Sequence, residues 1–231
     1  MKPKALVSWS GGKDCMLALW SARDTHDLVA LLTTVTREFD RISMHGVRVE
    51  LLRQQAESLG IPLRMVAIPY PCSNAIYEQA MKDAWAEAQQ QGVEAVICGD
   101  LFLEDVRRYR EDRLFGSQGC VFPLWRRSTP ELAREFIAMG FRAVLCCVDT
   151  QALPADFAGR EFDESLLRDL PASVDPCGEN GEFHTFVYAG PAFKTPIAFE
   201  LGERVLREER FAYCDLVADT MKVLPTIVGS Y

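Results

Sequence analysis

The sequence has 231 residues, of which 48% are hydrophobic and 25% charged. This is the composition of a soluble globular protein, and the length allows one large domain or two modest ones. No apolar run approaches the roughly 18 to 20 residues that cross a membrane, so no membrane association is expected. The formal net charge of −8 argues against nucleic acid as a partner, because non-specific binding depends on Lys and Arg neutralising phosphates.

Eight cysteines are scattered along the chain without a Cys-x-x-Cys pair. Neither a zinc ribbon nor a dithiol redox motif is therefore predicted, and most of the thiols are expected to be buried and reduced. The first apolar run begins close to residue 1 and leaves no room for a signal peptide. Together these features predict a cytoplasmic protein.

The opening stretch carries the most information. Residues 5–9 form a short, mainly apolar run, Gly11 and Gly12 interrupt it, and a helical pattern starts near Lys13. A strand, a tight glycine turn and a helix N-terminus together make an anion site, because the first helical N–H groups point at a ligand that glycines let approach. Lys13 adds positive charge, so phosphate is the expected guest. A plain strand-to-helix turn is the alternative that two glycines alone would favour.

Strand and helix signals then alternate through the first half. A continuous apolar run, typical of a parallel strand buried on both faces, occurs at 28–35, and further strands are expected at 63–68 and 93–98. Helical patterns lie between them, over 47–59 and from the expected N-cap Ser73 to Gly92. The inward positions of the second helix are expected to be Ile76, Ala80, Met81, Ala84 and Ala88. This order predicts an α/β fold, a doubly wound parallel sheet over residues 1–125.

Ligands of such sheets bind beyond the carboxyl ends of the strands, where the strand order reverses. Besides the glycine loop, the residues expected at that edge are Thr33, Thr34, His45, Gly99 and Asp100. A charged segment, 103–115, comes next. It is either a solvated helix face or a source of substrate contacts through Arg107, Tyr109 or Arg110.

The pattern changes after Trp125. A helix is expected from the N-cap Thr129 to Met139, and a short helix over 163–170. Strands are expected over 141–148, 183–188 and 197–205, the last with a turn at Gly202-Glu203. These elements predict a second, smaller α+β domain over residues 126–231.

A second unusual stretch is Gly178-Glu179-Asn180-Gly181-Glu182, followed by His184. Two carboxylates three residues apart between glycines make a poor core and a good polar turn. A solvated turn before an edge strand is one interpretation. In the other, the flexible glycines let Glu179 and Glu182 converge on an amine or on a metal that carries phosphate.

Ser-Gly-Gly-Lys-Asp after an N-terminal strand is neither a Walker A loop nor a dinucleotide-binding Gly-x-Gly-x-x-Gly. It resembles the pyrophosphate loop of the N-type ATP pyrophosphatases, the adenine nucleotide α-hydrolase superfamily. These enzymes cleave ATP between its α and β phosphates and adenylate a substrate. Their loop normally ends in Ser or Thr, so Cys15 is a departure.

The chain as a whole resembles the diphthine–ammonia ligase family of ATP-binding proteins. The resemblance rests on the Ser-Gly-Gly-Lys-Asp loop, Met44-His45, Gly99-Asp100, Pro123-Leu124-Trp125 and the Gly-Glu-x-Gly-Glu turn, in that order. It implies a nucleotide-binding domain, a second domain bearing the turn, and an active site between them. The implied reaction activates a carboxylate as an acyl-adenylate, releases pyrophosphate, and forms an amide with ammonia or an amine, giving AMP. Ligases acting on diphthine more often have Gly-Glu-Gly-Gly-Glu, so the resemblance leaves the carboxylate open, either a small molecule or a modified protein side chain.

The resemblance also implies roles for individual residues. Backbone N–H groups of Ser10, Gly11 and Gly12 and the Lys13 ammonium would hold the β and γ phosphates. Asp14 would hold Mg²⁺ or simply complement the helix dipole. The remaining ATP contacts would come from Val7, Ser8, Cys15, Thr33, Thr34, His45, Gly99 and Asp100. Substrate would meet Tyr109, Arg110, Gly178, Glu179, Asn180, Gly181, Glu182 and His184, and the catalytic residues would be Lys13, Asp14, Glu179 and Glu182.

Two other functions compete with the ligase. One is a tRNA-modifying enzyme on the same nucleotide-binding fold, against which the missing cysteine pair and the acidic charge count. The other is a nucleotide-binding sensor without turnover, for which Cys15 is the only indication. A homodimer is a candidate assembly.

Overall fold

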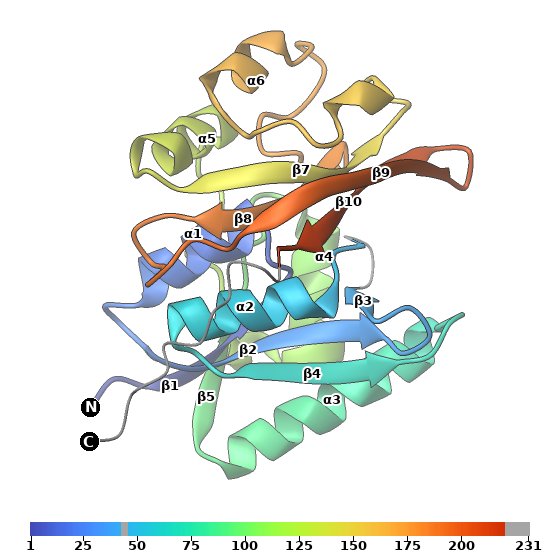
Figure 1. The fold of residues 1–231 in the computed structure, drawn as a ribbon. Coiled ribbons are helices and arrows are strands. Elements are labelled where there is room, and N and C mark those ends of the chain that lie inside the picture. The colour runs from blue at the N-terminus through green and yellow to red at the C-terminus, as the bar shows by residue number, and fades with distance from the viewer. Residues whose placement is uncertain (43–45, 220–231) are drawn as a thin grey trace, which may run out of the picture.

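The computed structural model describes residues 1–42 and 46–219. These residues form two β-sheets, one from each half of the chain (Figure 1). We call them sheet A, which holds β1 to β6, and sheet B, which holds β7 to β10. None of the described helices is long and apolar enough to span a lipid bilayer.

Sheet A is the predicted doubly wound sheet. Its parallel strands are β1 (Lys4–Ser8), β2 (Asp27–Thr36), β4 (Leu63–Ile68), β5 (Val93–Ile97) and β6 (Cys120–Val121). β1 pairs with β2 on one side and with β5 on the other, and β4 lies beyond β2. The chain therefore winds outward from β1 and returns to its other side, which puts the reversal of strand order between β1 and β5. The sequence did not predict the short β3 (Arg41–Ile42), which pairs antiparallel with the end of β2.

Helices cover both faces of sheet A (Figure 1). α1 (Lys13–Ala22) and α2 (Val49–Leu59) lie on the face toward sheet B, and α3 (Asn74–Gln90) lies on the other. The alternation along β1 fits this layering, since Ala5 and Val7 pack in the cluster that holds the α1 and α2 side chains, whereas Leu6 packs with α3. α4 (Glu104–Tyr109), a π-helical turn (Arg110–Phe115) and a 3₁₀ turn (Ser117–Gly119) then connect β5 to β6.

The second half contains the predicted mixture of helices and antiparallel strands. Its elements are α5 (Thr129–Ala138), β7 (Arg142–Asp149), a 3₁₀ turn (Ala155–Phe157), α6 (Glu164–Asp169), β8 (Phe183–Ala189), β9 (Phe199–Arg207) and β10 (Phe211–Ala218). Sheet B has the order β8-β7-β10-β9 with every neighbour antiparallel.

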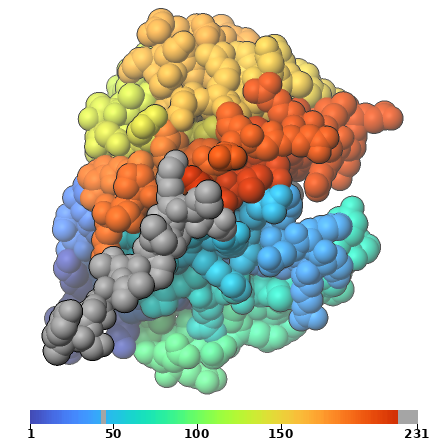
Figure 2. Space-filling model, viewed as in Figure 1, coloured from blue at the N-terminus to red at the C-terminus, as the bar shows by residue number. Residues whose placement is uncertain are grey.

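The two halves share one hydrophobic core. Trp9 and Leu52 from the first half lie in the same buried cluster as Phe186 and Val187 of β8. Figure 2 shows the second half, coloured yellow to red, resting directly on the blue and green first half. Sheet B is thereby fixed over the N-terminus of α1. The division into domains at residues 125 and 126 stays a prediction.

Three local predictions were wrong. The turn expected at Gly202-Glu203 is absent, because β9 continues through it and the chain reverses at Glu208-Glu209, both in the left-handed region with φ of 52°. Ile76, expected to face inward, is 47% exposed, whereas Met81, Ala84 and Ala88 of the same predicted face are buried. The N-cap of α5 is Ser128 and not Thr129, a shift of one residue.

Candidate functional site

The glycine loop joins β1 to α1 with little space around it. Gly12 is the N-cap of α1, in an extended conformation and without a side-chain cap. Gly11 has φ +78°, and a Cβ there would lie 2.9 Å from Gln55 Oε1. A Cβ on Gly12 would lie 3.1 Å from the carbonyl oxygen of Thr185. The positive φ of Gly11 favours glycine there, and a Cβ on Gly12 would crowd the backbone of Thr185.

Gln55 of α2 ties the loop to sheet B. Its side chain is fully buried. Nε2 donates to the carbonyl oxygens of Gly11 (3.0 Å) and Val187 (2.6 Å), and Oε1 accepts from Trp9 Nε1 (3.0 Å). The Val187 N–H also donates to Gly11 O (2.9 Å). Sequence reasoning missed Gln55, although a polar side chain on the apolar face of that helix was a signal.

Cys15 is accommodated inside the loop. Its thiol donates to the Gly12 carbonyl oxygen (3.0 Å), and the Ser10 hydroxyl donates to the sulfur (3.5 Å). Burial raises the pKa of the thiol, which therefore stays protonated at neutral pH. Cys15, which stands where related loops were expected to have Ser or Thr, thus forms its hydrogen bonds within the loop.

Lys13 is buried between the two halves, with 2% of its surface exposed. Its backbone N–H donates to Thr185 Oγ1 (3.1 Å). Its Nζ donates to Asp14 Oδ2 (2.9 Å) and to the carbonyl oxygen of Cys177. Burial lowers the pKa of Lys13, but Asp14 and other negative groups outweigh it and leave the pKa raised. Lys13 is therefore an ammonium ion.

The carboxyl ends of β1 and β5 meet beside this loop. Gly99 packs so closely on α1 that a Cβ there would lie 2.8 Å from the backbone of Asp14. Asp100 Oδ2 lies 2.7 Å from Arg110 Nε, and Arg110 Nη1 donates to Ser8 Oγ (3.3 Å). The fold thus brings the predicted ATP contact Ser8 and the predicted substrate contact Arg110 to Asp100, at the end of β5.

The two carboxylates of the glycine-bounded turn have different surroundings. Glu179 reaches sheet A, where Oε1 accepts from the backbone N–H groups of Leu101 (2.8 Å) and Phe102 (3.4 Å). Burial raises the pKa of Glu179 to about 7, and the charges of Asp14 and Asp100 add to the rise. A carboxyl group with this pKa can give or take a proton at neutral pH.

Glu182 instead holds the turn together. It is 7% exposed. Oε1 accepts from Asp175 N (2.9 Å) and Asn180 Nδ2 (3.0 Å), and Oε2 accepts from Asn180 N (3.0 Å). Asp175, which sequence reasoning missed, accepts in turn from Cys177 N (2.8 Å) and Thr129 Oγ1 (2.6 Å). The backbone of Gly178 (φ +69°) and Gly181 (φ +88°) is in the region that favours glycine.

The other predicted residues are spread around the site. Val7 is buried in the core, Thr34 is half-buried on β2, and Tyr109 packs against the α3 cluster. His184 lies on β8, where burial lowers its pKa to about 4, as does Lys13 to a smaller extent. His45 lies outside the described residues.

Four buried polar atoms of predicted site residues have no hydrogen-bond partner within the described part of the chain: Asp14 Oδ1, Thr33 Oγ1, Asp100 Oδ2 and Arg110 Nε. The last two form an ion pair with each other (2.7 Å). Buried polar atoms without a partner are costly, so Asp14 Oδ1 and Thr33 Oγ1 are suited to meet a ligand. Asp14 offers a carboxylate oxygen of the kind that Mg²⁺ prefers, and Thr33 offers a hydroxyl at the edge of sheet A.

Comparison with known families agrees with this architecture. The family model of the diphthamide synthase N-terminal domain matches residues 2–119, and that of the diphthamide synthase C-terminal domain matches residues 128–219. The chain belongs to the diphthamide synthase family. Among curated members, it is 27% identical to diphthine–ammonia ligase of Mus musculus, covering 89% of this chain and 85% of the relative. The corresponding protein of Homo sapiens is 26% identical over the same shares, and that of Danio rerio is 27% identical over 87% and 88%.

Proposed function

We propose that this member of the diphthamide synthase family is an ATP-dependent ligase that converts a carboxylate to an amide. ATP would adenylate the carboxylate with release of pyrophosphate, and ammonia or an amine would displace AMP. The observation that carries the proposal is the contact between the glycine loop and the Gly-Glu-Asn-Gly-Glu turn. Lys13 of the loop binds the carbonyl oxygen of Cys177, next to the turn, and Glu179 of the turn binds the strand end beside the loop.

The loop residues Ser10, Gly11, Gly12 and Lys13 would hold the β and γ phosphates, with Cys15 supporting the loop from within. The helix N-terminus at Gly12, which has no side-chain cap, and the ammonium of Lys13 support this assignment, since both are suited to anions. Val7, Ser8, Thr33 and Thr34 would line the adenine and ribose, and Gly99 with Asp100 would face the α-phosphate. His45 remains a proposed ATP contact.

Mg²⁺ is the cation that this chemistry requires. The buried Oδ1 of Asp14, which has no partner among the described residues, fits a role as its ligand. A bound Mg²⁺ would neutralise phosphate charge.

The turn would bind the acceptor. Glu179 is our candidate for handling the proton of the incoming nitrogen, because its pKa of about 7 matches neutral pH. Glu182 would act by holding the turn in shape through its hydrogen bonds to Asp175 and Asn180. The other proposed substrate contacts are Tyr109, Arg110, Gly178, Asn180, Gly181 and His184.

The curated relatives are named for diphthine and ammonia. For this chain we propose only the chemical class, a carboxylate on a small molecule or on a modified protein side chain, with ammonia or an amine as the nitrogen donor. A cytoplasmic location and a homodimer also stay predictions.

Product analysis tests the proposal. Purified protein is incubated with ATP, Mg²⁺, ammonium and fractions of a cell extract, and AMP and pyrophosphate are measured. We expect both products to appear only with a fraction that contains the carboxylate. The Lys13→Ala protein should make no AMP, and the Glu182→Ala protein should bind ATP normally but make no amide. If nucleotides stabilise the protein against heat and no fraction gives AMP, the protein is a sensor and not a ligase.

A further inference from the structure

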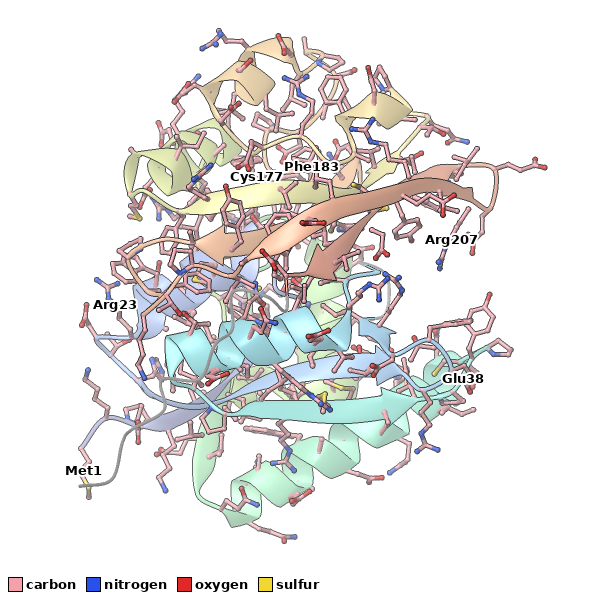
Figure 3. The ribbon with its side chains drawn as sticks, viewed as in Figure 1. Met1, Arg23, Glu38, Cys177, Phe183 and Arg207 are labelled. Atoms are coloured by element: carbon pink, nitrogen blue, oxygen red, sulfur yellow. The ribbon has the colours of Figure 1, made fainter. Side chains whose placement is uncertain are left out.

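The ammonium group of Lys13 lies in a cage that fits any small ammonium ion. Its polar walls are Asp14 Oδ2, at 2.9 Å, and the carbonyl oxygen of Cys177. Its other walls are the rings of Phe183 and Phe162, whose centroids lie 5.3 and 5.7 Å from Nζ. Cys177 and Phe183 are labelled next to each other in Figure 3.

The chemistry of these walls favours ammonium over sodium. Two oxygens accept N–H donors, and two aromatic faces attract a cation that has shed its water. A sodium ion needs more oxygen ligands than the cage offers, whereas NH₄⁺ presents the same head group as lysine. The cage uses Asp14 Oδ2, and it leaves Asp14 Oδ1 for the proposed Mg²⁺.

In the structure Lys13 fills the cage with its own side chain, so the same group cannot also touch a phosphate beyond the loop. We propose that Lys13 leaves this cage when ATP binds, and that an ammonium ion, the nitrogen donor of the reaction, takes its place between Asp14, Cys177, Phe162 and Phe183. The role of this ammonium ion as nitrogen donor rests on the proposed function, whereas the cage itself is formed by residues of the protein alone.

Glu179 follows Cys177 by two residues, and its carboxylate reaches the end of β5 beside the glycine loop, where it accepts from the N–H of Leu101 (2.8 Å). Ammonium gives one proton to the Glu179 carboxylate, and the lone pair freed on nitrogen forms a bond to the acyl carbon of the adenylate. The bond from that carbon to the AMP oxygen breaks, and AMP leaves with its electron pair. Nitrogen then loses a second proton to water, which leaves a neutral amide.

The first experiment opens the cage without ATP. The Lys13→Ala protein is melted in rising concentrations of ammonium chloride or sodium chloride at constant ionic strength. We expect a saturable rise in Tm with ammonium alone, and none for the wild-type protein, where Lys13 occupies the cage. Adding Phe183→Leu should raise the ammonium concentration that gives half the Tm shift about thirtyfold, the size of one desolvated cation–π contact.

Phe186→Leu is the matched control. Phe186 is equally buried on β8, but its ring packs on Phe199, with centroids 5.9 Å apart. This change should leave the ammonium response of the Lys13→Ala protein intact. Equal effects of ammonium and sodium, or equal effects of the two phenylalanine changes, would overturn the proposal.

A second experiment uses the wild-type protein, so it does not depend on the folding of a variant. With Mg²⁺ and α,β-methylene-ATP, which cannot be split between its α and β phosphates, ¹⁵N-ammonium should give a bound signal that is absent without nucleotide. If AMP forms in the product assay and no ammonium binds in either experiment, the ligase function stands and this site is wrong. If the cage binds ammonium but no AMP forms, the cage stands and the ligase function is wrong.

Discussion

The substitution Gln55→Leu tests how the glycine loop is held to sheet B. The substitution keeps a side chain of similar size but removes three hydrogen bonds, to Trp9 Nε1, Gly11 O and Val187 O. At about 1 kcal/mol for each hydrogen bond, the free energy of unfolding should fall by about 3 kcal/mol. In a chain of this length, that corresponds to a drop in Tm of roughly 6 to 12 °C.

The substitution should also weaken the binding of ATP to the glycine loop, because Gln55 holds Gly11 against β8. We expect the concentration of ATP that gives half-maximal stabilisation to rise in the Gln55→Leu protein. Urea unfolding gives the first quantity and thermal shift with ATP and Mg²⁺ gives the second.

Gln79→Leu is the control for Gln55→Leu. Gln79 lies exposed on α3 and donates only to Asp83 (2.7 Å), one helical turn away. Its replacement should change the free energy of unfolding by less than about 0.5 kcal/mol. If Gln55→Leu is no more destabilising than Gln79→Leu, Gln55 does not hold the loop to sheet B.

Three further predictions concern charge and space. The folded pKa of Glu179, about 7, lies above its ordinary 4.5, so ionising this group destabilises the fold. Urea unfolding from pH 4.5 to 7 should therefore show the stability of the wild-type protein falling relative to that of Glu179→Gln. Parallel plots of stability against pH would refute the assigned pKa. Asp215 of β10 pairs with Arg48 (2.6 Å) and Arg41 (2.9 Å), and these contacts lower its pKa to about 2. Asp215→Ala should therefore cost about 1 kcal/mol at pH 7, a difference that shrinks as the pH falls from 3.8 toward 2. A cost independent of pH would contradict the ion pairs. Gly99→Ala places a methyl group 2.8 Å from the backbone of Asp14, so we expect a lower Tm and weaker stabilisation by ATP, and an unchanged response to ATP would show that this contact does not shape the loop.

Much of the fold was determined by local sequence. Mainly apolar runs and glycine turns located β1, β2, β4 and β5 to within a residue or two. The glycine loop was equally clear, since the positive φ of Gly11 favours glycine and Thr185 lies close to Gly12. The N-cap Ser73 was correct because its hydroxyl accepts from a backbone N–H within the same turn, that of Ile76.

Other features followed only from the tertiary structure. The two-residue β3 has no pattern of its own, and the hairpin at Glu208-Glu209 uses residues that local preferences place elsewhere. The sequence could not distinguish Glu179 from Glu182, because their spacing from the glycines is the same. Packing against sheet A buries Glu179 and raises its pKa, whereas the backbone of the turn surrounds Glu182.

The cage around Lys13 illustrates the same limit. The sequence determined that a lysine follows two glycines at the start of a helix, and hence an anion site. It could not determine that Cys177, more than 160 residues further along the chain, would supply a carbonyl oxygen to that lysine. Contacts between residues so far apart depend on how sheet B packs over α1, and no short-range pattern encodes that packing.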